Sequence, residues 1–255
     1  MPSLTFEKEN NRPIAVIRSD NKDLDKKLIY LDDLPKNGIR EIDLSDKTTI
    51  FPVFKHVGKE KQNFRIGIFA KSGAGKSTVA GKVLDVMMKY NDNEKRIAIL
   101  SPIDEDAPLD VERGKDKELP IRIDINDPEV LSLTAADFEN CVVVFDDIES
   151  SENYPIIAKL RNSILETGRH YKTDIVVISH NILGGKNTKV VHSESTANFI
   201  FPRYSQFHHI NTFLKEYSGM KKSDIDRVLK LESRWVYVSN TAPAYIIYEH
   251  GVYLL

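Results

Sequence analysis

The segment FAKSGAGKST, residues 69–78, stands between an apolar run at 65–70 and a helical pattern at 75–90. It follows G-x-x-x-x-G-K-[ST], the pattern of a loop whose backbone N–H groups bind phosphate oxygens, except that Ala70 occupies the first glycine position. Alanine is acceptable there if its φ stays negative. With a strand before the loop and a helix N-terminus after it, the segment predicts a nucleotide-binding loop.

The loop contains the residue types that hold a nucleoside triphosphate and Mg²⁺. Lys76 supplies an ammonium group for the β- and γ-phosphates, and the hydroxyl of Ser77 suits Mg²⁺. We therefore expect ATP and Mg²⁺ as ligands. The expected nucleotide-binding residues are Ser72, Gly73, Ala74, Gly75, Lys76, Ser77 and Thr78.

Outward from this loop, strand-length apolar runs alternate with helical segments. Near-continuous Val and Ile runs are typical of strands buried on both faces of a parallel sheet. The pattern predicts an α/β fold, a P-loop NTPase with a mainly parallel central sheet flanked by helices. Strands are expected at 65–70, 96–100, 121–125, 141–145, 174–179 and 197–201, helices at 75–90, 129–138, 155–168, 207–217 and 223–231, and a closing hairpin at 234–238 and 245–249.

Residues 1–62 differ from the rest, because they are polar with three short apolar runs separated by turn residues. They predict a small β-rich N-terminal extension, followed by a P-loop ATPase domain at 63–255.

The bulk composition limits the class of protein. A content of 41% hydrophobic and 29% charged residues indicates a globular chain with a core. The formal net charge of −2 argues against a large open nucleic-acid surface, so any such contact is expected to be local. The single cysteine, Cys141, excludes an internal disulfide and suggests a reducing, intracellular compartment. No apolar run approaches the ~20 residues that span a bilayer, so we expect no membrane span.

Carboxylates end the strand CVVVFDDIE, residues 141–149. Triphosphate hydrolysis needs one carboxylate near Mg²⁺ and one group that activates water. We expect Asp146 to serve the metal and Asp147 to act as the base, with Glu149 as a fallback base.

Two further segments supply candidates near a γ-phosphate. We expect the strand of DIVVISHN, residues 174–181, to lie between the phosphate-loop strand and the carboxylate strand. Its tip would then offer Ser179, His180 or Asn181 to the γ-phosphate, with His180 taken as the catalytic candidate. In TGRHYKTD, residues 167–174, Arg169 could stabilise transition-state charge in its own subunit or in a neighbour's.

Taken in order, SGAGKST, VVVFDDIE, TGRHYKTDIVVISH and ESRWVYV…YIIYEHGVYLL resemble the genome-packaging ATPases of nucleocytoplasmic large DNA viruses, poxvirus-like members of the FtsK/HerA superfamily. The resemblance covers about residues 64–255. It implies a RecA/FtsK-like fold and an ATP-driven translocase that pumps viral DNA into a preformed capsid. By matching motif, it carries over Lys76, Ser77, Asp146, Asp147 and Arg169.

The same resemblance implies partners and a location. The partners are double-stranded DNA, viral capsid proteins and further copies of the chain in a ring, a pentamer or hexamer. The location is the cytoplasmic viral factory or the virion. The chain departs from the family at Ala70 and at the sensor tip, where glutamine is frequent and this sequence reads Ser179–His180–Asn181.

Two other classes of function stay open. Lys71 resembles the signature lysine of ParA/MinD-like ATPases, which act as nucleotide switches. Only in that class of protein should the loss of this lysine stop hydrolysis. A small-molecule kinase would need an arginine-rich lid, and the loop at 104–117 is more acidic than basic. For DNA contact, we expect a mobile basic loop at 181–192 with Lys186 and Lys189.

Overall fold

The structure is a computed structural model that describes residues 2–8, 11–33, 38–45, 47–55, 63–90 and 94–255. The chain forms two compact units, residues 1–57 with 199–255 and residues 58–198. The C-terminal residues therefore group with the N-terminal ones, and the domain limits 1–62 and 63–255 stay a prediction.

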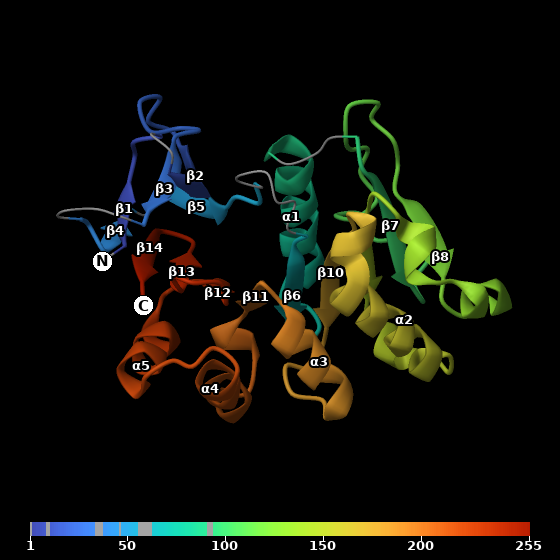
Figure 1. The fold of residues 1–255 in the computed structure, drawn as a ribbon. Helices are drawn as coiled ribbons and strands as arrows, with labels where there is room; N and C mark the ends of the chain where they lie inside the picture. The colour runs from blue at the N-terminus through green and yellow to red at the C-terminus, as the bar shows by residue number, and fades with distance from the viewer. Residues whose placement is uncertain (1, 9–10, 34–37, 46, 56–62, 91–93) are drawn as a thin grey trace. The chain divides into compact units, whose positions relative to one another are not determined.

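Unit 58–198 contains a parallel sheet with the strand order β6–β10–β9–β7–β8 (Figure 1). The strand β10 lies between β6 and β9, as the sequence predicts, because Ile178 pairs with Ile68 on one side and with Asp146 on the other. The carboxyl ends of these three strands therefore meet at one edge of the sheet. The five strands are β6 (Arg65–Phe69), β7 (Arg96–Ser101), β8 (Ile121–Asp124), β9 (Cys141–Asp146) and β10 (Asp174–Ser179).

The described residues of this unit also form three α-helices and four 3₁₀ helices. Every residue of β9 and β10 is buried, as expected for strands covered on both faces. Helix α1 buries Val79, Val83, Leu84 and Met87, the apolar side that its sequence predicts. The helices are α1 (Lys76–Tyr90), α2 (Tyr154–Thr167), α3 (Lys186–Glu194), η1 (Pro128–Ser132), η2 (Ala135–Phe138), η3 (Ile148–Ser150) and η4 (Gly168–Tyr171).

Two sequence predictions in this unit are wrong. The helix expected at 129–138 is a pair of short 3₁₀ helices, because Leu133 and Thr134 are extended and Thr134 and Asp137 form a capping box that starts η2 anew. The loop expected at 181–192 becomes helical at Lys186, because Gly185 takes a φ of 82° and Gly184 N–H donates to Thr188 at 2.9 Å.

Unit 1–57 with 199–255 is mainly antiparallel β structure (Figure 1). One sheet has the order β1–β3–β2–β5, which confirms the predicted β-rich N-terminal extension. A second run of strands has the order β4–β14–β13–β12. The elements are β1 (Ser3–Thr5), β2 (Arg12–Ser19), β3 (Leu28–Asp32), β4 (Glu41–Asp43), β5 (Thr48–Pro52), η5 (Pro202–Tyr204), α4 (Phe207–Glu216), α5 (Lys222–Lys230), β12 (Val236–Ser239), β13 (Tyr245–Tyr248) and β14 (Gly251–Leu254), with β11 (Ala197–Ile200) spanning the boundary between units.

Segments from the two ends of the chain build this unit together. Ile42 of β4 pairs with Val252 of β14, and the rings of Phe51, Phe199 and Trp235 lie 5.4–5.8 Å apart. The closing hairpin expected from the sequence is present as β12 and β13. The predicted α/β fold class is confirmed. Within the described residues, no helix is both long enough and apolar enough to cross a bilayer.

Candidate nucleotide-binding and hydrolytic site

The phosphate loop, residues 70–75, joins the carboxyl end of β6 to the first turn of α1. Ala70 is buried, has no positive φ, and donates its N–H to the carbonyl of Ser179 at 3.3 Å. Gly73 and Gly75 have φ values of 78° and 99°, which side chains rarely adopt. Glycine is thus retained where the backbone needs it, and alanine replaces it where the backbone does not.

Lys76 lies at the centre of a polar contact at this edge of the sheet. Its Nζ is 2.8 Å from Nδ1 of His180 and 4.0 Å from Oδ2 of Asp147. Nε2 of His180 is 2.8 Å from the same Asp147 oxygen. Because an ammonium group only donates, Nδ1 must accept, which leaves a neutral imidazole that donates from Nε2 to Asp147. The three residues predicted as base, sensor and phosphate-loop lysine therefore contact one another.

The charges here lie in a low-dielectric environment. Burial lowers the pKa of Lys76, while the carboxylates of Asp147, Asp146 and Glu149 oppose that shift. Burial raises the pKa of Asp147, and the charge of Lys76 acts against the rise. The site therefore contains buried charges that are not fully neutralised, and a bound ligand can compensate them.

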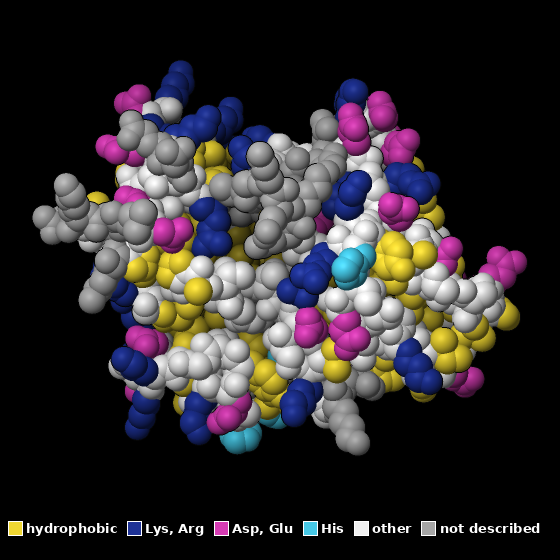
Figure 2. Space-filling model, in the orientation of Figure 1, with side chains coloured by type: hydrophobic (Ala, Val, Ile, Leu, Met, Phe, Trp, Pro, Cys, Tyr) yellow, Lys and Arg dark blue, Asp and Glu magenta, His cyan; other side chains and the backbone are white. Residues whose placement is uncertain are grey.

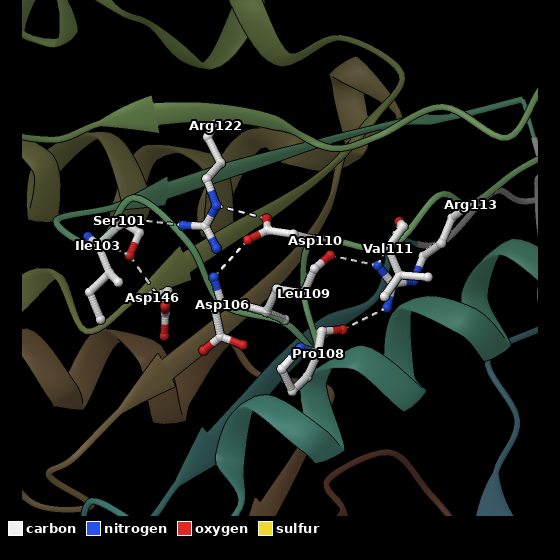
Figure 3. Close-up of polar contacts among 10 residues, drawn as sticks. All are labelled: Ser101, Ile103, Asp106, Pro108, Leu109, Asp110, Val111, Arg113, Arg122 and Asp146. Carbon is white, nitrogen blue, oxygen red and sulfur yellow. Dashed lines mark hydrogen bonds and ion pairs between the residues drawn. The ribbon is translucent and has the colours of Figure 1, made fainter.

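Asp146 is the most buried carboxylate of the group, with 2% of its surface exposed. Burial raises its pKa to about 6, and the nearby charges of Asp147 and Asp106 add to the rise. Ser101 at the end of β7 donates to its Oδ2 at 3.2 Å (Figure 3). Ser101 was not predicted from the sequence, although the apolar run at 96–100 ends at this edge of the sheet.

Asp147 turns the chain out of β9 with a left-handed backbone, φ 47° and ψ 39°. Aspartate tolerates this region better than most residues because it is short and polar. The N–H of Asp147 donates to the carbonyl of Ile178 in β10 at 3.2 Å. The neighbouring strand thereby fixes the direction of the carboxylate.

The alternatives at the tip of β10 are separated by their contacts. Ser179 is buried and donates to Oε1 of Glu149 at 2.8 Å, and it also accepts the N–H of Asn181. His180 contacts Lys76 and Asp147 instead. Among the contacts of the described residues, those to both Lys76 and Asp147 come from the His180 side chain, and Glu149 is held by Ser179.

Comparison with known proteins finds a viral relative of the chain. No protein-family model matches it. It is 32% identical over 218 residues to an uncharacterized protein, V3, of Sputnik virophage. The match covers 83% of this chain and 86% of V3. The chain belongs to the V3 family.

Solved structures share the fold of this V3-family chain at low sequence identity. The genome packaging NTPase B204 of Sulfolobus turreted icosahedral virus 2, in complex with AMPPCP, has a TM-score of 0.50 and 11% identity, over 74% of this chain and 98% of B204. The cytoplasmic domain of the type VII secretion ATPase EccC of Thermomonospora curvata has a TM-score of 0.52 and 12% identity, over 85% of this chain and 29% of that one. The RecA/FtsK-like fold implied by the sequence resemblance is confirmed.

Arg169, also predicted as catalytic, lies elsewhere in the structure of this V3-family chain. It is exposed in η4, which follows α2. The carbonyl of Tyr171 accepts from Asn140, the residue before β9, and the carbonyl of Gly168 accepts from Thr173, the residue before β10. Arg169 therefore lies at the amino-terminal edge of the sheet, about 20 Å of strand away from the phosphate loop. It does not contact the Lys76 group within one subunit.

The remaining residues fit a magnesium–nucleotide complex. Oδ1 of Asp147 and Oε2 of Glu149 are buried and have no hydrogen-bond partner among the described residues. In the same part of the chain, no three His, Cys, Asp or Glu side chains are arranged to hold a metal ion alone. Mg²⁺ commonly uses few carboxylates and completes its shell with phosphates and water, so a site with Ser77 and Asp146 as its protein ligands would fit this preference.

Proposed function

We propose that this chain is a Mg²⁺-dependent ATPase that moves double-stranded DNA and packages a viral genome into its capsid. The observation that carries the proposal is the contact among Lys76, His180 and Asp147 at the end of the phosphate loop. The fold likeness to a packaging NTPase and membership in a virophage family support the viral role.

The residues divide the work of hydrolysis. Backbone N–H groups of residues 72–78 and the ammonium of Lys76 bind the triphosphate. Ser77 and Asp146 would hold Mg²⁺, which would supply positive charge to the triphosphate. Asp147 accepts a proton from the attacking water, and His180 orients that carboxylate through its 2.8 Å contact.

His180 also links hydrolysis to the rest of the unit. The triphosphate is a stronger anionic partner for Lys76 than a neutral imidazole, so nucleotide binding draws Lys76 away from His180. Asn181 to Gly185 connect His180 directly to α3. A change at the γ-phosphate is thereby passed to the helix that follows the sensor.

DNA contact is proposed on α3. Lys186 begins this helix, although its side chain lies outside what the structure describes, and Lys189 is exposed on it. On the face shown in Figure 2, described Lys and Arg side chains are interspersed with Asp and Glu. This distribution fits a local contact with DNA rather than a broad basic surface. The ring of subunits, the capsid partner and the viral-factory or virion location belong to the same proposal.

The first test measures steady-state ATP hydrolysis with and without double-stranded DNA, for the native chain and for Asp147→Asn. We expect DNA to stimulate hydrolysis several-fold and Asp147→Asn to reduce it by about 10²–10⁴-fold, the usual contribution of a positioned base. Asp104→Asn removes an exposed carboxylate and is the matched control. DNA-independent hydrolysis would instead favour a nucleotide switch.

The kinase alternative is disfavoured by the loop at 104–117. Arg113 is buried and donates to Leu109, Val111 and Pro108 carbonyls and to Asp85. Arg122 on the adjacent strand is paired with Asp110. These arginines are committed to internal contacts, so they are not available as a phosphate-binding lid.

A further inference from the structure

Two aromatic side chains are exposed to solvent around the start of α4. Tyr204, the last residue of η5, is 40% exposed, and Phe207, the first residue of α4, is 66% exposed. Only two residues separate them in the sequence, so their Cα atoms lie at most about 11 Å apart. A single exposed apolar side chain is common on a protein surface, whereas two rings within one short segment form a local aromatic surface.

The buried side of α4 holds Phe207 on a fixed element. Phe207, Ile210 and Leu214 follow the spacing of one helix side, and both Ile210 and Leu214 are completely buried. Phe207 therefore continues the apolar side of α4 beyond the core of its unit. Its ring is presented to solvent by a helix that is anchored behind it.

Two arginines accompany these rings. The guanidinium group of Arg234 lies over the ring of Tyr204, 5.8 Å from its centroid, and the N–H of Arg234 donates to Glu249 at 2.6 Å. Arg203, next to Tyr204, is 3.8 Å from the carboxylate of Glu232, whose side chain is 93% exposed. An ion pair in water contributes little, so Arg203 can exchange Glu232 for another anion.

The charge around the rings fits an anionic partner. Residues 202–234 contain seven Lys and Arg and four Asp and Glu, which gives them a net charge of +3, whereas the whole chain has −2. Gln206 and His208, on either side of Phe207, are exposed and polar. A stable protein interface buries about 800 Å² per partner around an apolar centre, and two rings among polar neighbours do not provide that centre.

We propose that η5 and the start of α4 bind the unpaired bases of a single nucleic-acid strand. Tyr204 and Phe207 stack on bases, and Arg203 and Arg234 contact phosphates. Aromatic side chains stack on the flat face that every base has, whatever the sequence. In a duplex these faces are already stacked on one another, so the surface favours single strands. It belongs to the compact unit that does not contain α3, and binding here does not require ATP hydrolysis.

The test measures the affinity of the native chain and its variants for a fluorescein-labelled DNA single strand of about 16 nucleotides. Fluorescence anisotropy reports binding, and the duplex of the same sequence is measured in parallel. We expect Phe207→Ser to weaken single-strand binding by about 5- to 50-fold, the effect of losing one stacked base, and to leave duplex binding unchanged. Phe6→Ser, which removes a 47% exposed ring just after β1 in the same unit, is the matched control and should change neither.

The dependence on salt separates stacking from charge. Phe207→Ser removes no cation, so the slope of log affinity against log salt concentration should stay as in the native chain. Arg203→Gln should reduce this slope by about 0.7, the value for one phosphate contact on a single strand. An RNA strand of the same sequence, measured in the same way, identifies which nucleic acid binds more tightly.

Equal single-strand affinities of the native chain and Phe207→Ser would overturn the inference, and so would equal losses for single strand and duplex. A lower oligomer mass of Phe207→Ser with unchanged strand binding would instead assign the ring to a contact between copies. ATP hydrolysis of the same samples, with and without duplex, tests the proposed function separately. Duplex-stimulated hydrolysis without any effect of Phe207→Ser on strand binding contradicts this inference alone, and Phe207-dependent strand binding without hydrolysis contradicts the proposed function alone.

Discussion

At the scale of single residues, His180 shows how a neutral ring connects two charged groups. A histidine between an ammonium and a carboxylate gains a hydrogen bond on each side only in the neutral Nε2–H form. A glutamine at this position would offer the same pair of functions through its amide oxygen and amide nitrogen. His180 therefore performs hydrogen-bonding chemistry that an uncharged amide could also supply.

A second histidine predicts how the stability of the protein depends on pH. His192 of α3 is 2% exposed, and its Nε2 bonds the carbonyl of Ile182. Burial lowers its pKa from 6.5 to about 4. The unfolded chain therefore takes up a proton first as the pH falls, so stability present above pH 6.5 is lost between about pH 6.5 and pH 4. The loss amounts to about 3 kcal/mol.

His192→Gln removes this titration and keeps a donor for Ile182. We expect the unfolding free energy of the native chain, from urea denaturation, to fall more steeply than that of the variant over this pH window. His170→Gln, at an exposed position in η4, is the control. Parallel curves for the native chain and His192→Gln would show that His192 does not titrate on unfolding.

At the scale of elements, the packing of α1 against the segment after β7 depends on Gly81, which has no side chain. A glycine inside a helix usually costs about 1 kcal/mol relative to alanine. At Gly81, however, an added Cβ would lie 2.5 Å from the backbone carbonyl oxygen of Pro108. The close approach brings the segment that contains Asp106 against α1.

Gly81→Ala should therefore destabilise the protein instead of stabilising it. We expect a loss of about 1–3 kcal/mol, typical of overpacking against backbone that must shift. Lys82→Ala, an exposed position on the same helix, should stay within about 0.5 kcal/mol of the native chain. Denaturant midpoints measure both, and a gain of stability in Gly81→Ala would mean that the segment moves freely.

Elements with local signals were predictable from the sequence. Two such signals are strong because they arise from adjacent or periodic residues. They are the Val and Ile runs of β9 and β10 and the apolar side of α1. The order β6–β10–β9 also followed from the spacing of motifs, and the pairing confirms it.

Features that depend on distant contacts were not predictable. Strand β4 gains its partner only from β14, some two hundred residues later. Helix α3 is stabilised by the contact of His192 with Ile182 and by Gly184 with Thr188, none of which the composition of 181–192 reveals. The shape of the acidic segment after β7 depends on Arg122 and Arg113, which bond to it from outside its apolar pattern.

At the scale of the whole molecule, Arg169 poses the question of how many subunits make one active site. It lies at the sheet edge opposite Lys76 and Asp147, too far to reach the nucleotide that we propose for its own subunit. A head-to-tail ring brings unlike faces of successive subunits together, which allows an exposed arginine to reach a neighbour's γ-phosphate. We therefore expect Arg169 to act in trans.

Mixing two inactive variants tests this expectation. Lys76→Ala has no working nucleotide site but keeps Arg169, and Arg169→Ala keeps the site but lacks the arginine. If Arg169 acts in trans, about a quarter of the interfaces in a mixed head-to-tail ring join an intact site to an intact arginine, and ATP hydrolysis returns on mixing. A mixture of Arg169→Ala with the double variant has no such interface and should stay inactive. Absence of recovery in the first mixture, when both variants assemble together, would restrict Arg169 to a structural role at the end of α2.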